Sequence, residues 1–270
     1  MHTPVKKIKD LGKLSGEVLL FGGAYSNLPA TQALIIAADQ RGIPSSNCIF
    51  TGDAIGYCAN PGSSFGAVLQ ASEMICGNVE KQLANEEADC GCGFAPDSEC
   101  DAMSRDWYAF ANKRLTPEQR TKMRSLPDIL TFLHEGKRYA VIHGGVTNIS
   151  RFIWPTSPKE EFQREIEELG KLVAPLDGVI AGHCGIAFIR RFGDLEWINP
   201  GAIGLPPNNG RRETRFVILG ERGPVIHRLS YDAVSSADAI RKSDLKPGYD
   251  KALLSGFWPS EEILPPELCR

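Results

Sequence analysis

Residues 178–204 read GVIAGHCGIAFIRRFGDLEWINPGAIG, and this stretch decides the fold. Its apolar run at 179–181 predicts a short buried strand. Gly182 and His183 follow directly, so the strand places an imidazole on a loop at its carboxyl end. Imidazole is a common metal ligand and proton carrier, which makes this strand end a candidate site.

Three further apolar runs end in the same way. They cover 49–52, 74–77 and 139–142, and they are followed by Asp53, Asn78 and His143. In open α/β sheets, ligands bind outside the carboxyl ends of the strands. We therefore expect Asp53, Asn78, His143 and His183 to converge although they lie far apart in the sequence.

The order of these motifs resembles a known family. Gly52-Asp53, Gly77-Asn78, His143-Gly144, Gly182-His183 and Asn199-Pro200-Gly201 follow the order and approximate spacing of the calcineurin-like metallophosphoesterases, over most of residues 16–230. TGDAIGYCANP and INPGAIGLP look most similar to the bacterial branch that hydrolyses small phosphoesters or dinucleoside polyphosphates. The resemblance implies an α/β fold in which two packed mixed β-sheets are flanked by helices, a four-layer αββα sandwich.

The sequence departs from the family in three motifs. The usual Asp-x-His reads Gly23-Ala24-Tyr25, the usual Gly-Asn-His-Asp reads Gly77-Asn78-Val79-Glu80, and the usual Gly-His-x-His reads Gly182-His183-Cys184-Gly185. By position, the first of the family's two metal sites keeps only the bridging Asp53. The second keeps Asp53, Asn78, His143 and His183, so the resemblance implies half of a binuclear centre.

This reduced set has chemical consequences. Two imidazoles, a carboxylate and an amide oxygen suit one divalent transition metal, Mn, Fe or Zn, and a second metal is doubtful. One metal still polarises a phosphoryl group for attack by water, but the two-metal clamp on attacking and leaving oxygens is lost. Val79 also stands where the family has a catalytic His, a general acid worth about 10²–10⁴ in rate. We expect weak or altered phosphoesterase activity, or none.

Three functions remain open at this stage. The first is a metal-dependent phosphoesterase that hydrolyses a phosphomonoester, a phosphodiester or a nucleotide pyrophosphate with one retained metal. The second is a phosphoesterase that rebuilds the lost site with Tyr25, Glu80 or Cys184. The third is a catalytically inactive protein that binds a nucleotide or another protein.

Candidate substrate-binding residues come from two polar segments. Tyr25 and Asn27 lie in the altered first motif, where a phenol or an amide can face a phosphate. Arg211 lies in the polar loop 208–212, and a guanidinium group suits phosphate geometry.

Composition favours a single globular domain over residues 1–270, with an acidic, cysteine-containing loop and a helical insertion at about 81–126. A net charge of −3 gives no reason to expect nucleic acid or a membrane surface as partner. Residues 1–15 carry no secretory signal pattern, and no apolar run reaches about 18 residues, so we expect a cytoplasmic protein. The family resemblance implies that it acts on a small phosphorylated substrate or nucleotide. The tail at 247–270 leaves a homo-oligomer open.

The insertion holds Cys90, Cys92 and Cys100, whose spacing is unusual for a zinc site. An exposed loop with incidental thiols is favoured, with a structural metal or a redox pair as the alternative.

Ser104 is expected to cap a helix whose aromatic residues pack in the core rather than stack on a nucleobase. Hairpins are expected at 129–142, 186–198 and 214–229, and helices at 28–41 and 160–173.

Overall fold

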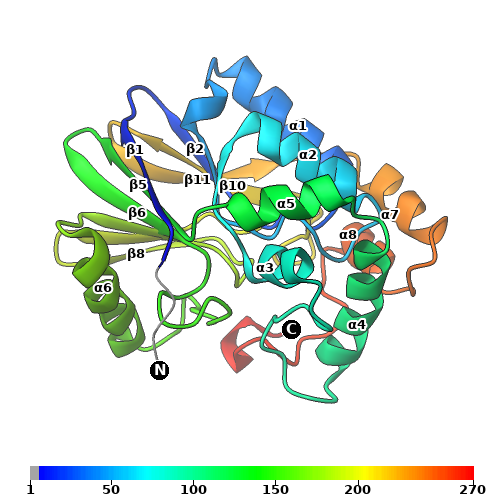
Figure 1. Cartoon of the computed structure of the whole chain (residues 1–270). Helices are drawn as coiled ribbons and strands as arrows, with labels where there is room; N and C mark the ends of the chain where they lie inside the picture. Colours follow the sequence, from blue (N-terminus) through cyan, green and yellow to red (C-terminus); the bar gives the residue numbers. More distant parts are fainter. Residues whose placement is uncertain (1–5) are drawn as a thin grey trace.

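The computed structural model describes residues 6–270, so the first five residues, which include His2 and part of the segment examined for a signal, lie outside the described residues. Within 6–270, a six-stranded and a five-stranded sheet pack face to face. Helices cover the two outer faces (Figure 1). The predicted α/β sandwich of two mixed sheets is confirmed.

The five-stranded sheet has the order β11-β10-β2-β3-β4. Its strands are β2 (Val18–Phe21), β3 (Cys48–Phe50), β4 (Glu73–Met74), β10 (Thr214–Gly220) and β11 (Gly223–Leu229). β2, β3 and β4 are parallel, and the predicted hairpin β10–β11 joins them antiparallel through β2. The carboxyl ends of the three parallel strands therefore meet at one edge.

The six-stranded sheet has the order β1-β5-β6-β7-β9-β8. Its strands are β1 (Ile8–Lys13), β5 (Ile129–His134), β6 (Lys137–Ile142), β7 (Gly178–Ala181), β8 (Phe188–Phe192) and β9 (Leu195–Asn199). The hairpins β5–β6 and β8–β9 are as predicted, whereas the edge strand β1 was not predicted. β6, β7 and β9 are parallel, so their carboxyl ends also lie at one edge.

Alternating side chains explain why the central strands of both sheets are buried on both faces. In β2, Val18 and Leu20 enter the core between the sheets, while Leu19 and Phe21 enter the core under the helices. In β6, Val141 points between the sheets and its neighbours point to the opposite face. Strands buried on both faces read as continuous apolar runs, which is the pattern of these segments.

Helices form the outer layers. α1 (Leu28–Gln40) and α2 (Pro61–Ala71) cover the five-stranded sheet, and α6 (Lys159–Val173) covers the six-stranded one (Figure 1). The remaining helices are α3 (Asn78–Asn85), α4 (Glu99–Asn112), α5 (Pro117–Ser125), α7 (Ala233–Arg241) and α8 (Tyr249–Ser255). The insertion and the C-terminal tail lie at the same end of the molecule (Figure 1).

One helix start was predicted wrongly. α4 begins at Glu99, because the Ser98 hydroxyl accepts a hydrogen bond from the Asp101 backbone N–H at 3.1 Å, whereas Ser104 lies inside the helix. Its aromatic residues Trp107, Tyr108 and Phe110 are buried, which confirms their role in core packing. No helix within residues 6–270 is long and apolar enough to cross a membrane.

Candidate metal centre

Four side chains converge where the two sheets meet. Asp53 follows β3 and Asn78 opens α3 after β4, both from the five-stranded sheet. His143 follows β6 and His183 follows β7, both from the six-stranded sheet. We call Asp53, Asn78, His143 and His183 the donor cluster. Each of these residues is at the carboxyl end of its strand, as the sequence predicted.

The donor atoms of the cluster lie within contact distance of one another. His143 Nε2 is 2.9 Å from Asn78 Oδ1, 3.1 Å from His183 Nδ1 and 3.2 Å from Asp53 Oδ2. His183 Nδ1 is 4.0 Å from Asp53 Oδ2. Three of the four residues thus offer atoms that can hold one metal ion, with the Asn78 oxygen beside them.

Hydrogen bonds made by the other polar atoms of His143 and Asn78 determine which atoms present lone pairs to the donor cluster. His143 Nδ1 is 2.7 Å from the Thr51 carbonyl, which only accepts, so Nδ1 carries the hydrogen and the neutral ring presents a lone pair at Nε2. Asn78 Nδ2 donates to the Cys90 carbonyl at 3.0 Å, so its Oδ1 faces His143. Lone pairs that face each other need a proton or a cation between them, and nitrogen with oxygen donors fits a divalent transition metal.

The pKa values of the two imidazoles and of Asp53 show where a proton competes with a cation for these lone pairs. Burial and the neighbouring His143 lower the pKa of His183 to about 3, so this imidazole stays neutral and keeps its lone pair. For His143, burial lowers the pKa but the Asp53 charge outweighs it, and the net pKa is raised. Burial raises the pKa of Asp53, yet the two imidazoles lower it overall. A cation must therefore displace a proton that His143 and Asp53 otherwise share.

Glu80 supports the cluster from behind. It is fully buried, and its carboxylate accepts the backbone N–H groups of Asp53, Ala54 and Gly77, each at 2.9 Å. Burial and the Asp53 charge raise its pKa to about 7. Both oxygens are committed to the backbone, so Glu80 holds the Asp53 loop and caps α3 rather than rebuilding a metal site.

Two close approaches require glycine beside the donor cluster. A Cβ on Gly52, whose φ is +97°, would lie 2.6 Å from His143 Nδ1. A Cβ on Gly77 would lie 2.3 Å from Asp53 Oδ1. Asp53 and His183 themselves have a φ of +64°, a costly backbone conformation that clusters at functional sites.

The turn at residues 22–27, here called the β2 turn, carries no metal donors of the family's kind. The Tyr25 ring fills the space that a side chain at position 23 would need, because a Cβ on Gly23 would lie 2.5 Å from Tyr25 Cζ. Tyr25 also packs against Tyr57, with ring centroids 4.6 Å apart. A phenol ring thus fills the turn in which the family resemblance implies two missing ligands.

The other candidate ligands and substrate contacts have different partners. Cys184 is buried, which raises its thiol pKa to about 12. Asn27 caps α1, donates to the Gly204 carbonyl and accepts from the Ser236 hydroxyl, so it ties the fold together. Arg211 lies in an exposed loop and does not line the cavity beside the cluster. Of the three substrate-binding candidates, only Tyr25 reaches that cavity.

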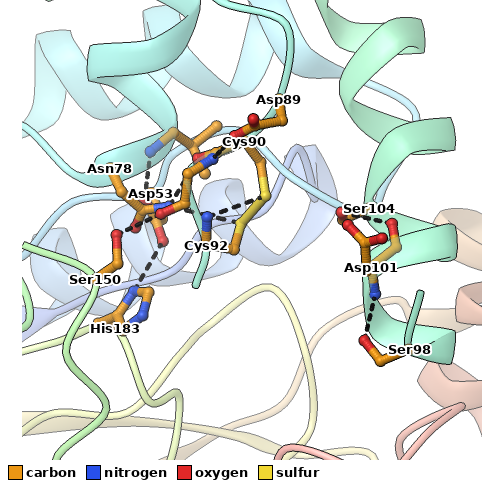
Figure 2. The surroundings of a disulfide bond; sticks show 12 residues. Asp53, Asn78, Asp89, Cys90, Cys92, Ser98, Asp101, Ser104, Ser150 and His183 are labelled. Atoms are coloured by element: carbon orange, nitrogen blue, oxygen red, sulfur yellow. Dashed lines mark hydrogen bonds and ion pairs between the residues drawn. A yellow bond between two sulfur atoms is a disulfide. The ribbon is translucent and has the colours of Figure 1, made fainter. Parts of the chain in front are cut away.

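The cysteine loop lies against the donor cluster. Cys90 and Cys92 form a disulfide, and Figure 2 shows it beside Asn78 and His183. Both cysteines are buried and joined as a disulfide, so the expectation of an exposed loop with incidental thiols is wrong for this pair. The Ser150 hydroxyl donates to the Gly91 carbonyl and ties the loop to the segment after β6. Cys100 is free.

A cavity of about 50 Å³ opens beside Asp53 and His183. Aromatic residues dominate its wall, and we call it the aromatic cavity. They are Tyr25, Tyr57, Phe94, Phe152, Tyr249 and Trp258. The sequence analysis missed most of them, because they come from separate loops and from the C-terminal tail and form no local pattern.

The comparisons with known proteins concern the fold. No protein-family model matches the sequence, and no curated protein matches it significantly. Among solved structures, a metallophosphoesterase from Sphaerobacter thermophilus aligns with a TM-score of 0.67 and 18% identity, covering 90% of this chain and 100% of that one. The hypothetical protein PH1004 from Pyrococcus horikoshii aligns with a TM-score of 0.71 and 16% identity, covering 91% and 100%. The chain therefore has the fold of the calcineurin-like metallophosphoesterases.

Proposed function

We propose that the protein is a phosphoesterase that uses one divalent transition metal, Mn, Fe or Zn. The observation that carries the proposal is the convergence of Asn78 Oδ1, His183 Nδ1 and Asp53 Oδ2 around His143 Nε2. Asp53, Asn78, His143 and His183 are the residues that would hold the ion. The Tyr25 ring beside Gly23 supports a single site.

The ion would supply Lewis-acid polarisation of the phosphoryl group. The chain adds a neutral hydrogen-bond donor, because burial and Tyr57 raise the pKa of the Tyr25 phenol well above its ordinary value and keep its proton in place. The aromatic cavity gives this face of the cluster a largely apolar wall, which strengthens electrostatic interactions there. Val79, which is buried, offers no proton to the leaving group.

A second candidate function is a catalytically inactive protein that binds a nucleotide or a protein. The observation that favours it is the filled first site, because Tyr25 takes the place of two ligands without supplying a general acid. The two candidates differ in one measurable respect. A hydrolase needs the metal, whereas a binding protein of this kind does not.

Metal content tests the proposal. The purified protein is dialysed against Mn, Fe or Zn in turn, and bound metal is counted by elemental analysis for the natural protein, His183→Ala and His227→Ala. His227 lies on β11, far from the cluster in the fold, and is the matched control. We expect one equivalent in the natural protein and the control, and none in His183→Ala.

Turnover is then measured in the metal that binds, with 4-nitrophenyl phosphate and bis(4-nitrophenyl) phosphate. Hydrolysis that disappears in His183→Ala but persists in His227→Ala supports the phosphoesterase. If the protein binds no metal under any of these conditions, the phosphoesterase proposal is rejected and the binding function remains. Two bound equivalents would contradict the single site.

A further inference from the structure

The donor cluster faces an aromatic wall on its open side. The ring of Phe152 lies 4.2 Å from the His183 ring, measured between centroids. Tyr25 and Asp53 both line the aromatic cavity, so a group bound at the donor cluster would directly contact the apolar wall of that cavity. The volume of about 50 Å³ is room for a few water molecules, and therefore for a small ester group.

The cavity has no cationic side chain of its own. Among residues 6–270, none of the residues that line it is lysine or arginine. Arg151 is next to Phe152 in the chain, but its guanidinium pairs with the buried Glu165 at 3.1 Å. Asp53 is the carboxylate in the lining, so the chain adds a negative charge to the place where a phosphate would bind.

Charge balance then distinguishes the substrates. One divalent ion with Asp53 and two neutral imidazoles leaves a net charge of about +1, and the buried Glu80 carboxylate behind Asp53 lowers it further. A phosphodiester carries one negative charge and comes nearest to balancing the site. A phosphomonoester above its second pKa of about 6 carries two, and a polyphosphate carries more. An uncompensated charge in a buried, apolar site is costly.

We propose that the protein selects monoanionic phosphodiesters over phosphomonoesters and polyphosphates, with an uncharged, apolar ester group in the aromatic cavity. This inference rests on the proposed function, because it places the phosphate at the metal.

Binding of a matched ligand pair tests the selection directly. Methyl phenyl phosphate and phenyl phosphate share the ring and differ by one methyl group and one charge. Both are titrated into the metal-loaded protein by calorimetry at about pH 8, where the monoester is a dianion. We expect the diester to bind at least about tenfold more tightly. Equal affinities, the reverse order, or no binding of either ligand would overturn the proposal.

Two variants of Met103, which lines the cavity from α4, sharpen the test. Met103→Lys adds a cation on a side chain of similar length. We expect it to tighten the binding of phenyl phosphate about tenfold, while the affinity for methyl phenyl phosphate changes less than about threefold. Met103→Leu is the matched control and leaves the ratio unchanged. An unchanged ratio in a folded Met103→Lys protein would contradict the role of charge.

The same samples separate this inference from the proposed function. Turnover of bis(4-nitrophenyl) phosphate decides whether the protein is a hydrolase, and the binding ratio decides whether it selects diesters. Tight diester binding without turnover would keep the selection and reject the hydrolase. Turnover of bis(4-nitrophenyl) phosphate together with tighter binding of phenyl phosphate would support the hydrolase and reject the selection of diesters.

Discussion

The donor cluster and the β2 turn are neighbours at the same edge of the fold, yet they differ in what they retain. The cluster keeps polar side chains whose lone pairs face one another. The β2 turn has no such donors but keeps its backbone path, because the N–H groups of Gly23, Tyr25 and Ser26 donate to the carbonyls of residues 52, 53 and 54 at 2.8–3.2 Å. The turn thus supports the Asp53 loop through its backbone, and the Tyr25 ring fills the space beside Gly23.

The largest expected effect comes from removing the support of the cluster. Glu80→Ala leaves three backbone N–H groups without an acceptor in a buried place. Each such group costs about 1–3 kcal/mol, so we expect the free energy of unfolding to fall by about 3 kcal/mol or more. Chemical denaturation measures it, and the exposed Glu160→Ala on α6 is the control. A loss below about 1 kcal/mol would mean that Glu80 does not hold the Asp53 loop.

The next effect tests the filled first site. Gly23→Asp forces a Cβ to within 2.5 Å of Tyr25 Cζ and 2.8 Å of Ala202 Cβ. Such overpacking costs about 1–3 kcal/mol. Gly42→Asp is a matched control for backbone strain, because Gly42 also has a positive φ, of +68°, but no atom lies within 4 Å of its Cβ. Chemical denaturation should therefore show a larger loss for Gly23→Asp.

A double variant turns this comparison into a gain of function. Gly23→Asp with Tyr25→His removes the obstructing ring and restores the two donors of the family's first motif. We expect it to recover stability relative to Gly23→Asp alone and to bind a second metal equivalent, counted by elemental analysis. A stoichiometry that stays at one would show that the β2 turn no longer positions ligands even when they are present.

These regions also show what the sequence can predict. Each member of the donor cluster follows an apolar run within a few residues, so strand periodicity and motif order were enough to bring the four together. The aromatic cavity has no such signal, because Phe94, Phe152 and Trp258 approach it from a loop, another loop and the tail. Its shape depends on tertiary packing between segments that are far apart in the chain.

Local sequence patterns led to a missed or wrong prediction where two interpretations were possible. β1 is a lysine-bearing edge strand that pairs only with β5, and charged residues on edges hide the apolar alternation of a strand. Ser98 and Ser104 are both good helix caps by type. Ser98 is the actual cap, and Glu99 and Asp101 follow it in the first turn, where negative charge is stabilised.

A smaller effect concerns pH. Burial lowers the pKa of His143, but Asp53 outweighs it and the net pKa lies above 6.5. The shared proton stabilises the metal-free fold below the unfolded value of about 6.5, and this contribution is lost as the pH rises through the folded pKa. Because the metal must displace this proton, its apparent affinity should fall about tenfold per pH unit below the folded pKa.

Calorimetric titration of the metal at a series of pH values measures this dependence. Two buffers of different ionisation enthalpy report the proton that is released. His227→Ala is the control, since His227 is outside the cluster and should leave the dependence unchanged. An affinity that is flat between about pH 5 and 8, without proton release, would show that the proton and the ion do not compete.

The smallest expected effect concerns the loop behind Asn78. Its amide donates to the Cys90 carbonyl and lies 3.5 Å from Cys92 Sγ, so the disulfide stiffens the support of one metal ligand. Groups behind a metal ligand typically contribute about 10–100-fold in affinity, and here the Cys90 carbonyl itself remains. We therefore expect Cys90→Ser with Cys92→Ser to weaken metal binding by up to about tenfold, and reduction of the natural protein to do the same. The exposed Cys269→Ser should have no effect. Unchanged affinity in both the variant and the reduced protein would mean that backbone contacts alone orient Asn78, and that the donor cluster is independent of the disulfide in this loop.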